Sequence, residues 1–397
     1  MQTPFSFNAA ARLVDFMRQA DQPGLINLAA GVPALEALPF NALRGAVETA
    51  LAANGASMFA YHHPEGDHVL REQLAGRLRR REVEAVQGSD LVTATGCTQA
   101  LQVMLSILVN PGDIVACEAP AYYGLLELIA EAKARVLPLP VTSGAGIDLD
   151  ATEELLTRWK PKCLVVCTSL SNPSGATLPQ AGRERLVQIC RKTGVRLIED
   201  DIYAELVDGG APKPCRAYDD GSTVSFVTSF SKTISPGLRI GYCVPGTPEL
   251  HDAFAAKKCQ QDLHSSVVSE VTLRAFLAAG AFDPHLEWLR ERNRQRRALV
   301  LDTIGRFFPA GTRVEAPEGG YMLWAELPPR VDIARLRDDA RAEGVAFAAG
   351  PVFFAEPPAA AEAGVPRSHA AMRINCAKAG ESDLERGIAI LGRLMAE

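Results

Sequence analysis

"TSFSKTISPGLRIGY", residues 228–242, places Lys232 after Ser229 and Ser231 and before Arg239. Serine hydroxyls and the planar fork of a guanidinium together suit a phosphate dianion. A lysine amine beside such a site is a good nucleophile toward an aldehyde once burial and nearby cations lower its pKa. For an isolated Ser-Lys pair, however, an exposed lysine is the commoner explanation. Whether Lys232 is a nucleophile therefore depends on the other residues that the sequence predicts beside it.

Composition and charge narrow the class of protein. The chain has 397 residues, 47% of them hydrophobic, which is enough for a sizeable core and predicts two packed regions. Its net charge of −6, from 41 basic and 47 acidic residues, argues against nucleic acid or a membrane surface as the main partner. The one dense basic run, RLRRR at 77–81, lies on a helical pattern and is predicted to be a solvated face.

The cysteines indicate a reducing compartment. There are nine, an odd number, scattered through apolar runs, which favours free thiols over a disulfide framework. Cys163 and Cys167 flank a strand-like run with no histidine nearby, so no metal site is expected. The N-terminal MQTPFSFNAA lacks the features of a signal peptide, and no run of about 18 apolar residues occurs. We therefore expect a cytoplasmic protein without a transmembrane segment.

Strand-like and helix-like runs alternate from about residue 90 to residue 245, which is typical of an α/β domain with a mostly parallel sheet. The expected strands are 90–96, 114–120, 134–141, 163–169, 195–201 and 223–230. The helices between them include 149–159, with Asp150 as its N-cap, and 178–194, which Gly194 is expected to close.

After Pro245 the pattern changes to long helices, a few short strands and a closing amphipathic helix. This pattern indicates a smaller α+β domain, which the loop-rich first 45 residues are expected to join. We place the large domain at 46–285 and the small domain at 1–45 with 286–397. The run AEPPAAAEAG, at 355–364, is predicted to be a surface loop.

Residues that follow the predicted strands are candidates for a binding site, because ligands of open α/β sheets lie outside the carboxyl ends of the strands. Gly96, Cys97 and Thr98 begin a helix and offer backbone N–H groups to an anion. Tyr122 offers a planar ring and Asn172 an amide. Each of these features also has an ordinary explanation on its own, as a turn or a packed aromatic.

Two carboxylates, Asp200 and Asp201, follow the next strand, with Tyr203 close behind. Neighbouring residues on a strand point to opposite faces, so the two cannot form a paired-carboxylate site, and one of them is expected to be solvated. A carboxylate here can bind a metal, act as an acid or base, or pair with a protonated ring nitrogen.

Five of the six expected strand ends therefore supply an anion cradle, a stacking ring, an amide, a carboxylate and an amine nucleophile. This set suits a phosphorylated aromatic aldehyde with a ring nitrogen, a description that pyridoxal 5′-phosphate meets. The chemistry of that cofactor assigns a Schiff base to Lys232 and the role of pyridinium partner to the carboxylate.

The same segments resemble the class I and II aminotransferases of fold type I, in the order in which that family has them. SFSKTISPGLRIGY resembles the lysine signature of the family. The other matching segments are YHHPEGDHVLREQLA (61–75), TGCTQAL (95–101), PAYYG (120–124), SNPSG (171–175), EDDIY (199–203) and MRINCA (372–377). The likeness covers nearly the whole chain and points to 2-aminoadipate and kynurenine aminotransferases and to the aminotransferase-like domain of MocR-type regulators. It implies a mostly parallel seven-stranded sheet in a large domain and a smaller α+β domain.

The resemblance implies a role for each matching residue that would meet the cofactor. Lys232 would carry the cofactor as a Schiff base and move the proton, while Asp200 would pair with the pyridine nitrogen. Tyr203 and Asn172 would contact the ring hydroxyl oxygen, and Tyr122 would stack on the ring. The implied phosphate ligands are the amides of Cys97 and Thr98, Ser229, Ser231, Arg239 and, from the other subunit, Tyr61. The family often has serine at the position of Cys97, so a hydroxyl contact is lost here and the amide contact is kept.

The resemblance further implies transamination between an L-α-amino acid and a 2-oxo acid, in a homodimer with shared active sites. Arg373 would bind the substrate α-carboxylate, and Asn172 and Gly31 would also contact the substrate. The segment AAGVPALEALPF (29–40) should lie over the substrate and offers apolar side chains, one glutamate and no arginine. This composition disfavours dicarboxylic substrates and allows neutral or aromatic ones.

Two alternatives stay open. The same residues support β-elimination, racemisation or oxidation at the substrate Cα. MocR-type regulators use this fold as an effector-sensing domain behind a winged helix. Here the fold begins almost at Met1, with no helix-turn-helix pattern before it, so we expect an enzyme with small-molecule substrates and neither a nucleic acid nor a membrane partner.

Overall fold

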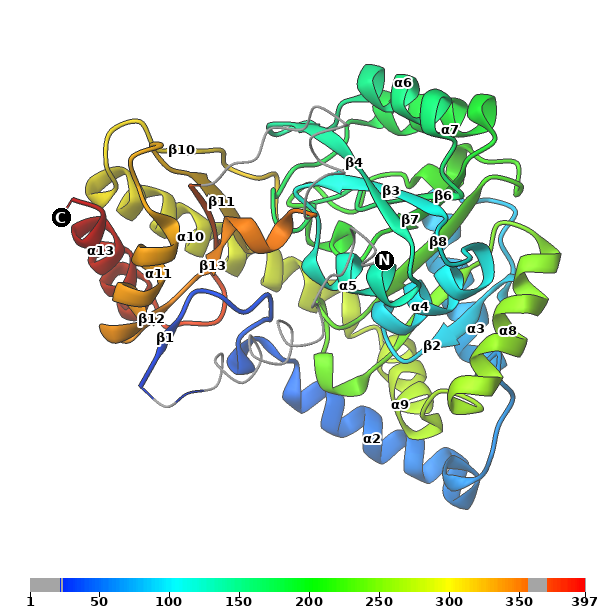
Figure 1. The fold of residues 1–397 in the computed structure, drawn as a ribbon. Coiled ribbons are helices and arrows are strands. Elements are labelled where there is room, and N and C mark those ends of the chain that lie inside the picture. The colour runs from blue at the N-terminus through cyan, green and yellow to red at the C-terminus, as the bar shows by residue number, and fades with distance from the viewer. Residues whose placement is uncertain (1–21, 23, 356–369, 397) are drawn as a thin grey trace.

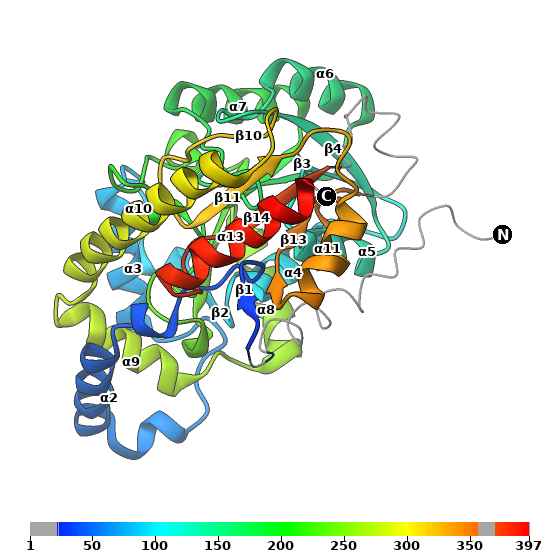
Figure 2. The ribbon, with the colours of Figure 1, turned by 90° about the vertical axis from the view of Figure 1, so that its left-hand side faces the viewer.

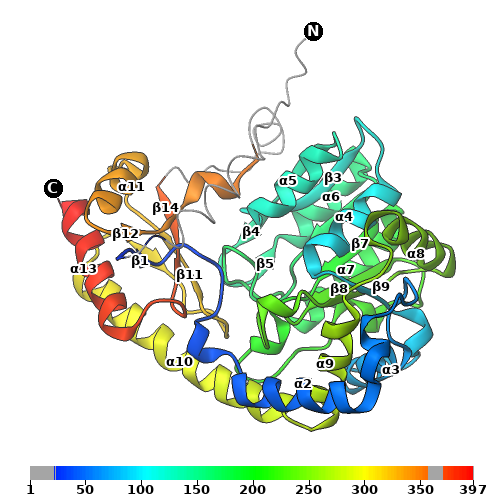
Figure 3. The ribbon, with the colours of Figure 1, turned by 90° about the horizontal axis from the view of Figure 1, so that it is seen from below.

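The computed structural model describes residues 22, 24–355 and 370–396, which form a large sheet with helices on both faces beside a smaller sheet (Figure 1). The long helix α10 (Phe282–Phe307) runs along both parts, as Figure 3 shows from below. The N-terminal segment considered above and all but Ala355 of the loop predicted at 355–364 lie outside the described residues.

The large sheet has the strand order β2-β9-β8-β7-β6-β3-β4-β5. Strands β4, β3, β6, β7 and β8 run parallel, β9 is antiparallel to both of its neighbours, and β5 is antiparallel to β4. The bounds are β2 (Val92–Ala94), β3 (Ile114–Ala119), β4 (Arg135–Thr142), β5 (Gly146–Ile147), β6 (Cys163–Val166), β7 (Arg196–Asp200), β8 (Val224–Ser229) and β9 (Gly241–Val244). The expected α/β fold with a mostly parallel sheet is confirmed, with the two-residue β5 added to the seven expected strands.

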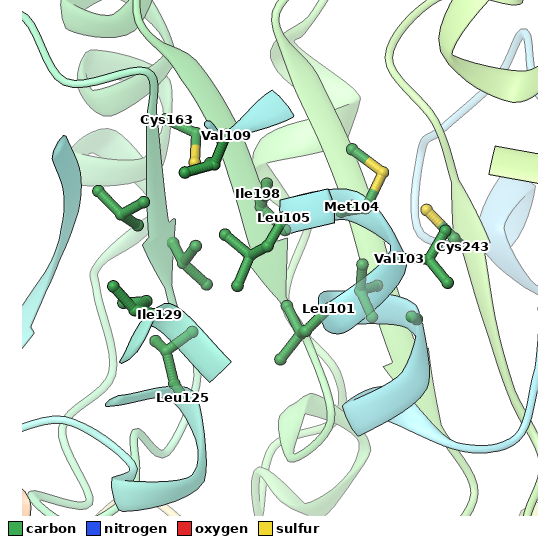
Figure 4. Close-up of a cluster of buried hydrophobic side chains, with 14 of the residues drawn as sticks. Leu101, Val103, Met104, Leu105, Val109, Leu125, Ile129, Cys163, Ile198 and Cys243 are labelled. Atoms are coloured by element: carbon green, nitrogen blue, oxygen red, sulfur yellow. The ribbon is translucent and has the colours of Figure 1, made fainter. Parts of the chain in front are cut away.

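Side chains of the central strands alternate between two apolar cores, as the period of a strand requires. Cys163, Val165 and Ile198 pack with α4 (Cys97–Leu108), α5 (Tyr123–Glu131) and α8 (Pro248–Asp262). Figure 4 shows part of this cluster, in which Leu105 of α4 lies beside Ile198 of β7. The intervening Leu164 and Leu197 belong to the core under α6 (Leu149–Trp159) and α7 (Gln180–Thr193). Burial on both faces stabilises the sheet and fixes which way each strand-end side chain points.

The ends of helices α6 and α7 test two sequence predictions. Asp148, not Asp150, is the N-cap of α6, because its carboxylate accepts hydrogen bonds from the amides of Asp150 and Ala151. The prediction of Asp150 as N-cap was therefore wrong by two positions. Gly194 does close α7, with φ of 70° in the left-handed region that glycine adopts without strain.

The smaller sheet has the order β10-β11-β14-β13 and is antiparallel throughout. Figure 2 views this part from the side on which helices α10, α11 and α13 lie, and these helices share one apolar core with the sheet. Strand β1, near the N-terminus, pairs with β12, so the beginning of the described chain joins this part. The bounds are β1 (Ile26–Asn27), β10 (Arg313–Val314), β11 (Met322–Glu326), α11 (Ile333–Ala342), β12 (Val345–Ala346), β13 (Ala348–Ala349), β14 (Ala371–Asn375) and α13 (Glu381–Ala396).

Three further helices, α2, α3 and α9, pack together beside the β2 edge of the large sheet (Figure 3). Their bounds are α2 (Phe40–Asn54), α3 (His68–Arg80) and α9 (Val267–Ala278). The short 3₁₀ turns are η1 (Leu35–Ala37), η2 (Gly55–Phe59), η3 (Gly88–Asp90), η4 (Ala204–Leu206), η5 (Cys215–Tyr218), η6 (Pro236–Leu238) and η7 (Gly350–Phe353).

The basic run at 77–81 is only partly the solvated face that was predicted, because Arg79 and Arg80 are exposed whereas Arg77 and Arg81 are not. Arg77 is partly buried and pairs with Glu205 and Asp283 at 3.0 and 2.9 Å. Arg81 is more buried still and lies against Asp201. Helix α3 therefore directs part of its positive charge into the large domain, where carboxylates neutralise it.

The described residues also bear on compartment and metal binding. All nine cysteines are free, as expected. Within residues 22, 24–355 and 370–396 no helix is long and apolar enough to cross a membrane. In the same residues no group of three or more His, Cys, Asp or Glu side chains is arranged to hold a metal ion.

Candidate active site

Lys232 lies just beyond β8, at the carboxyl end of the large sheet. Its partly buried Nζ donates a hydrogen bond of 2.6 Å to the carbonyl oxygen of Gly31, a residue predicted to contact the substrate. Burial, followed by the nearby Arg373 charge, lowers the pKa of Lys232 to about 8, although Cys97 and Asp200 act in the opposite direction. A substantial fraction of this amine is therefore neutral near physiological pH, as a nucleophile requires.

Asp200 is the last residue of β7 and has the same parity as Ile198, so it faces the α4 side of the sheet. Its Oδ1 accepts hydrogen bonds from the Cys97 thiol at 3.1 Å and from the Ile202 amide at 3.2 Å. Burial raises the pKa of Asp200 to about 6, and these two hydrogen bonds limit the increase. The carboxylate therefore lies at the start of α4, within the set of predicted cofactor residues.

Asp201 points the other way and is buried, so the expectation that one of the two aspartates is solvated was wrong. Arg81 binds it in a bidentate pair, with distances of 2.5 and 3.0 Å. Asp201 is 2% exposed, because α3 covers this face and supplies the arginine. The two side chains do point to opposite faces, as predicted. The carboxylate of Asp201 is paired with Arg81 and not with water.

The predicted phosphate residues surround the turn that begins α4. Ser229 and Ser231 are buried and their hydroxyls lie 2.9 Å apart, while Ser229 also donates to the carbonyl of Ile240. Arg239 donates to the carbonyl of Thr95 at 3.0 Å. Cys97 and Thr98 are the first two residues of the helix, so their amides are among those without an intrahelical partner. Arg239 thus reaches the turn that begins α4, and the two hydroxyls lie at or just beyond the end of β8, two strands from β2 in the same sheet. We call these groups, together with the amides of Cys97 and Thr98, the cradle.

Gly96 is required at the start of this cradle. Its φ is 86°, which disfavours other residues, and a Cβ there would lie 2.7 Å from Nη2 of Arg239. Arg239 itself has a φ of 52°, in the left-handed region that non-glycine residues seldom adopt. Two uncommon backbone conformations are therefore maintained where the guanidinium passes over the glycine, as is frequent at functional sites.

The two predicted aromatic residues, Tyr122 and Tyr203, follow strands β3 and β7. Tyr122 caps α5 and packs on Tyr123 with 4.9 Å between ring centroids. Gly124 makes room for it, because a Cβ there would lie 2.5 Å from the Tyr122 ring. Tyr203 is 5% exposed, and the Lys232 amine lies 6.0 Å from its ring centroid. Burial raises the pKa of Tyr203 above its ordinary value, so its hydroxyl stays protonated and can donate.

Arg373, on β14 of the smaller sheet, reaches the same place and is fully buried. One η-nitrogen donates to Oδ1 of Asn172 at 2.6 Å and the other to the carbonyl of Ala29 at 2.5 Å. Its guanidinium also lies over the Phe353 ring, 5.1 Å from the centroid. The Nε is buried and has no hydrogen-bond partner among the described residues, so this donor is available to a ligand.

The turn that carries Asn172 is held from behind by a second carboxylate of β7. Glu199 accepts a hydrogen bond of 2.8 Å from the Thr168 hydroxyl, which in turn accepts one from Arg183. Arg183, fully buried on α7, also donates to the Thr168 carbonyl and to the Ser169 hydroxyl. This buried network fixes the backbone that leads to Asn172.

Tyr61 has no hydrogen bond to another predicted cofactor residue within the described part of the chain. It is 84% exposed and packs edge-on against His264, with ring centroids 5.7 Å apart. Its neighbour Phe59 is 71% exposed, as are Leu35 at 84% and Phe40 at 70%. These four large side chains are exposed at the two ends of α2, on η1, on the first residue of α2, on η2 and just after η2, and we call them together the α2 surface.

Sequence reasoning did not single out Tyr321, Phe353 or Glu118. The Tyr321 hydroxyl donates to the Gly31 carbonyl at 3.4 Å, the same oxygen that Lys232 contacts. Glu118 is buried on β3 and accepts a hydrogen bond from the Cys167 amide, and its burial raises its pKa to about 8. Tyr321 follows a Gly-Gly pair and Glu118 precedes the PAYYG segment, but neither position alone distinguishes a site residue from a packed one.

The assembled residues fit pyridoxal 5′-phosphate. The cradle offers hydroxyl, guanidinium and amide donors to a dianion, and a glycine leaves the space that a Cβ would fill. Asp200 is an acceptor for a protonated ring nitrogen, and Arg373 has a buried Nε without a hydrogen-bond partner and donates to two neutral oxygens, those of Asn172 and Ala29. Lys232 supplies the amine between these groups.

Comparison with known proteins agrees with this fit. The family model for aminotransferase class I and II matches residues 23–391. Aromatic-amino-acid aminotransferase 1 of Thermococcus litoralis is 30% identical over 352 residues, which cover 87% of this chain and 84% of that protein. YjiR, an HTH-type transcriptional regulator of Escherichia coli, is 28% identical over 378 residues, which cover 95% of this chain and 78% of the regulator.

A solved structure shows that the fold is similar over nearly the whole chain. LysN, the α-aminoadipate aminotransferase of Thermus thermophilus, complexed with N-(5′-phosphopyridoxyl)-L-leucine, aligns with a TM-score of 0.85 at 28% identity. The alignment covers 98% of both chains. The match to the family model over most of the sequence and the 30% identity to an aminotransferase over most of both chains establish the family. The chain belongs to the class I and II aminotransferases.

Proposed function

We propose that this chain transfers the amino group of a neutral or aromatic L-α-amino acid to a 2-oxo acid, with pyridoxal 5′-phosphate bound to Lys232. The observation that carries the proposal is the position of the Lys232 amine. It lies partly buried between the carbonyl of Gly31 and the ring of Tyr203, with its pKa lowered to about 8. Asp200 and Arg373 contribute to the electrostatics of the same amine.

When bound, the cofactor supplies an electron sink for the carbanion that forms when the substrate loses its α-proton. Asp200 would keep the ring nitrogen protonated, and the Cys97 thiol would hold that carboxylate in place. The Lys232 amine would accept the α-proton of the substrate and would hold it for return during the reaction. Tyr203 and Asn172 would orient the ring, and the cradle of Ser229, Ser231 and Arg239 would hold the phosphate.

Arg373 is well placed to bind the substrate α-carboxylate. Its guanidinium is fully buried, two of its nitrogens are fixed by Asn172 and Ala29, and its Nε is without a partner. A carboxylate would supply the missing acceptor and balance the buried charge. Gly31 lies against this guanidinium, where a Cβ would be 3.5 Å from Nη1, so the substrate would pass beside it.

The substrate class rests on the 29–40 segment. Leu35 and Phe40 are exposed there, and Glu36 is paired with Arg292 of α10 at 2.8 Å. Arg292 is thus already paired with Glu36, and the segment itself has no arginine, which supports neutral or aromatic side chains. Relatives named for aromatic amino acids and for α-aminoadipate show that the family includes both kinds of specificity.

We propose a homodimer with composite active sites, built from a large domain at 46–285 and a small domain of the remaining residues. The α2 surface supports this proposal, since monomeric proteins rarely expose several large apolar side chains together. A second copy of the chain would cover that surface, and Tyr61 would then reach the partner's cradle. The free cysteines support a reducing compartment, such as the cytoplasm.

The first prediction tests the function. The purified chain, supplied with pyridoxal 5′-phosphate, should convert neutral or aromatic amino acids to 2-oxo acids with 2-oxoglutarate or pyruvate as acceptor. Lys232→Ala should lose this turnover by several orders of magnitude, whereas Lys192→Ala, on an exposed lysine, should match the wild type. Cofactor binding without amine transfer to any acceptor would favour a sensing domain of the kind found in the regulators.

The second prediction separates the two aspartates. Asp200→Asn should keep the thermal stability and slow exchange of the substrate α-proton by orders of magnitude, because the ring nitrogen loses its anionic partner. Asp201→Asn should lower the free energy of unfolding by about 3 kcal/mol, because Arg81 remains buried without its counter-charge. Thermal unfolding and NMR-detected exchange of the α-proton in deuterated water measure the two effects. The opposite assignment would show that Asp201 faces the cofactor.

The third prediction tests the composite site by subunit complementation. Lys232→Ala and Tyr61→Phe homodimers should each be impaired, the latter in cofactor retention. In a mixed heterodimer one site carries both lesions and the other carries neither, so up to half of the wild-type activity should return. Heterodimers that form and show no recovery would place Tyr61 in its own subunit's site and contradict the composite model.

A further inference from the structure

The end of helix α8 contains a buried ion pair that the site described above does not use. Lys258 is fully buried, and its Nζ donates to Oδ1 of Asp262 at 2.9 Å, one helical turn away. The other oxygen of Asp262 accepts hydrogen bonds from the side chains of Gln99, at 2.7 Å, and Thr95, at 3.1 Å. Asp262 thus accepts three hydrogen bonds, although its side chain is 26% exposed.

The two residues that Asp262 holds lie on either side of Gly96, where the anion cradle begins. Thr95 precedes the glycine, and its carbonyl accepts the hydrogen bond from Arg239. Gln99 lies in the first turn of α4, and its Oε1 accepts from the Thr95 amide at 2.7 Å. Asp262 therefore joins the strand end, the helix start and, through Thr95, the guanidinium that passes over Gly96.

Lys258 compensates the negative charge of Asp262. Burial alone would raise the pKa of Asp262, but the hydrogen bonds from Gln99 and Lys258 and the lysine charge outweigh it and lower the pKa. An ionised carboxylate beside an anion cradle would repel a phosphate dianion. Lys258 neutralises that charge, so Asp262 can organise the turn while Arg239 remains the net charge of the cradle.

We propose that Asp262, neutralised by Lys258, is a positioning residue that shapes the cradle around Gly96 for a phosphate dianion. The proposal rests on the proposed function, because it takes the phosphate of the cofactor as the ligand. It assigns to the α8 end a part in cofactor retention and none in proton transfer. Substitution of a residue that acts through the cradle should weaken binding of the phosphate group and hardly change binding of the pyridine ring.

The test compares two aldehydes that differ only in the phosphate. Equilibrium binding of pyridoxal 5′-phosphate and of pyridoxal to the full-length apoprotein is measured by absorbance for five variants and the wild type. The variants are Asp262→Ala, Asp262→Asn, Lys258→Met, the double variant Asp262→Asn/Lys258→Met and the control Asp252→Asn. Asp252 is on the same helix and 87% of its side chain is exposed, so its substitution should change neither affinity.

Loss of Asp262 should weaken binding of pyridoxal 5′-phosphate about tenfold, as is common for outer-shell partners, and leave pyridoxal binding within about twofold. Lys258→Met should weaken the phosphate form at least as much, because a bare carboxylate then faces the dianion. The double variant should bind better than Lys258→Met alone, because the asparagine oxygen can still accept from Thr95 or Gln99 without a net charge.

Three outcomes would overturn the inference. Equal losses of affinity for both aldehydes would mean general damage to the fold. A lowered melting temperature of the Asp262→Asn variant would show that damage. Wild-type affinities in all variants would mean that the cradle is shaped without Asp262. If the wild type binds neither aldehyde, the proposed function itself fails and the inference fails with it.

Discussion

Consecutive side chains of a β-strand point to opposite faces, and the end of β7 carries three acidic residues in a row. Glu199 turns toward α7 and joins the Arg183 network, Asp200 turns toward α4 and meets Cys97, and Asp201 turns away again to pair with Arg81. Three carboxylates at one strand end would repel each other strongly without partners. Each has its own partner, with Glu199 and Asp201 on one face and Asp200 on the other, and only Asp200 lies among the proposed cofactor residues.

The site depends on this separation of the charges. The two outer carboxylates are structural: one holds the turn that carries Asn172, and the other fixes α3 on the sheet. Asp200 is left with a thiol and an amide as hydrogen-bond donors, and no arginine or lysine forms an ion pair with it among the described residues. Its raised pKa is a consequence of this environment and leaves it ready to pair with a cationic ring nitrogen.

The amine of Lys232 is balanced in a similar way. Burial and Arg373 disfavour its charge, while Asp200 and Cys97 favour it, and the pKa remains near 8. Arg373 comes from β14 of the smaller sheet, so the two packed parts of the chain must meet for this balance to arise. Catalysis in this account therefore depends on tertiary packing as much as on the residues themselves.

The sequence predicted the fold and the cluster at the strand ends, because strand parity and the rule for ligands of α/β sheets need only the order of elements. It missed the N-cap at Asp148 because Asp150 fits the same pattern two positions later. Burial of Arg81 and Asp201 was not predictable, since it depends on how α3 packs against a strand far along the chain. Asp262 was missed for the same reason, as it meets Thr95 and Gln99 only in the folded chain.

The most direct measurement is the location of the cofactor on the chain. The apoprotein is mixed with pyridoxal 5′-phosphate, reduced with borohydride, digested and mapped by mass spectrometry. We predict that the label lies on Lys232 and that its capture increases as the pH rises through about 8, because the neutral amine is the nucleophile. A label on another lysine, above all on Lys258 beside the cradle, would contradict the central claim that Lys232 binds the cofactor.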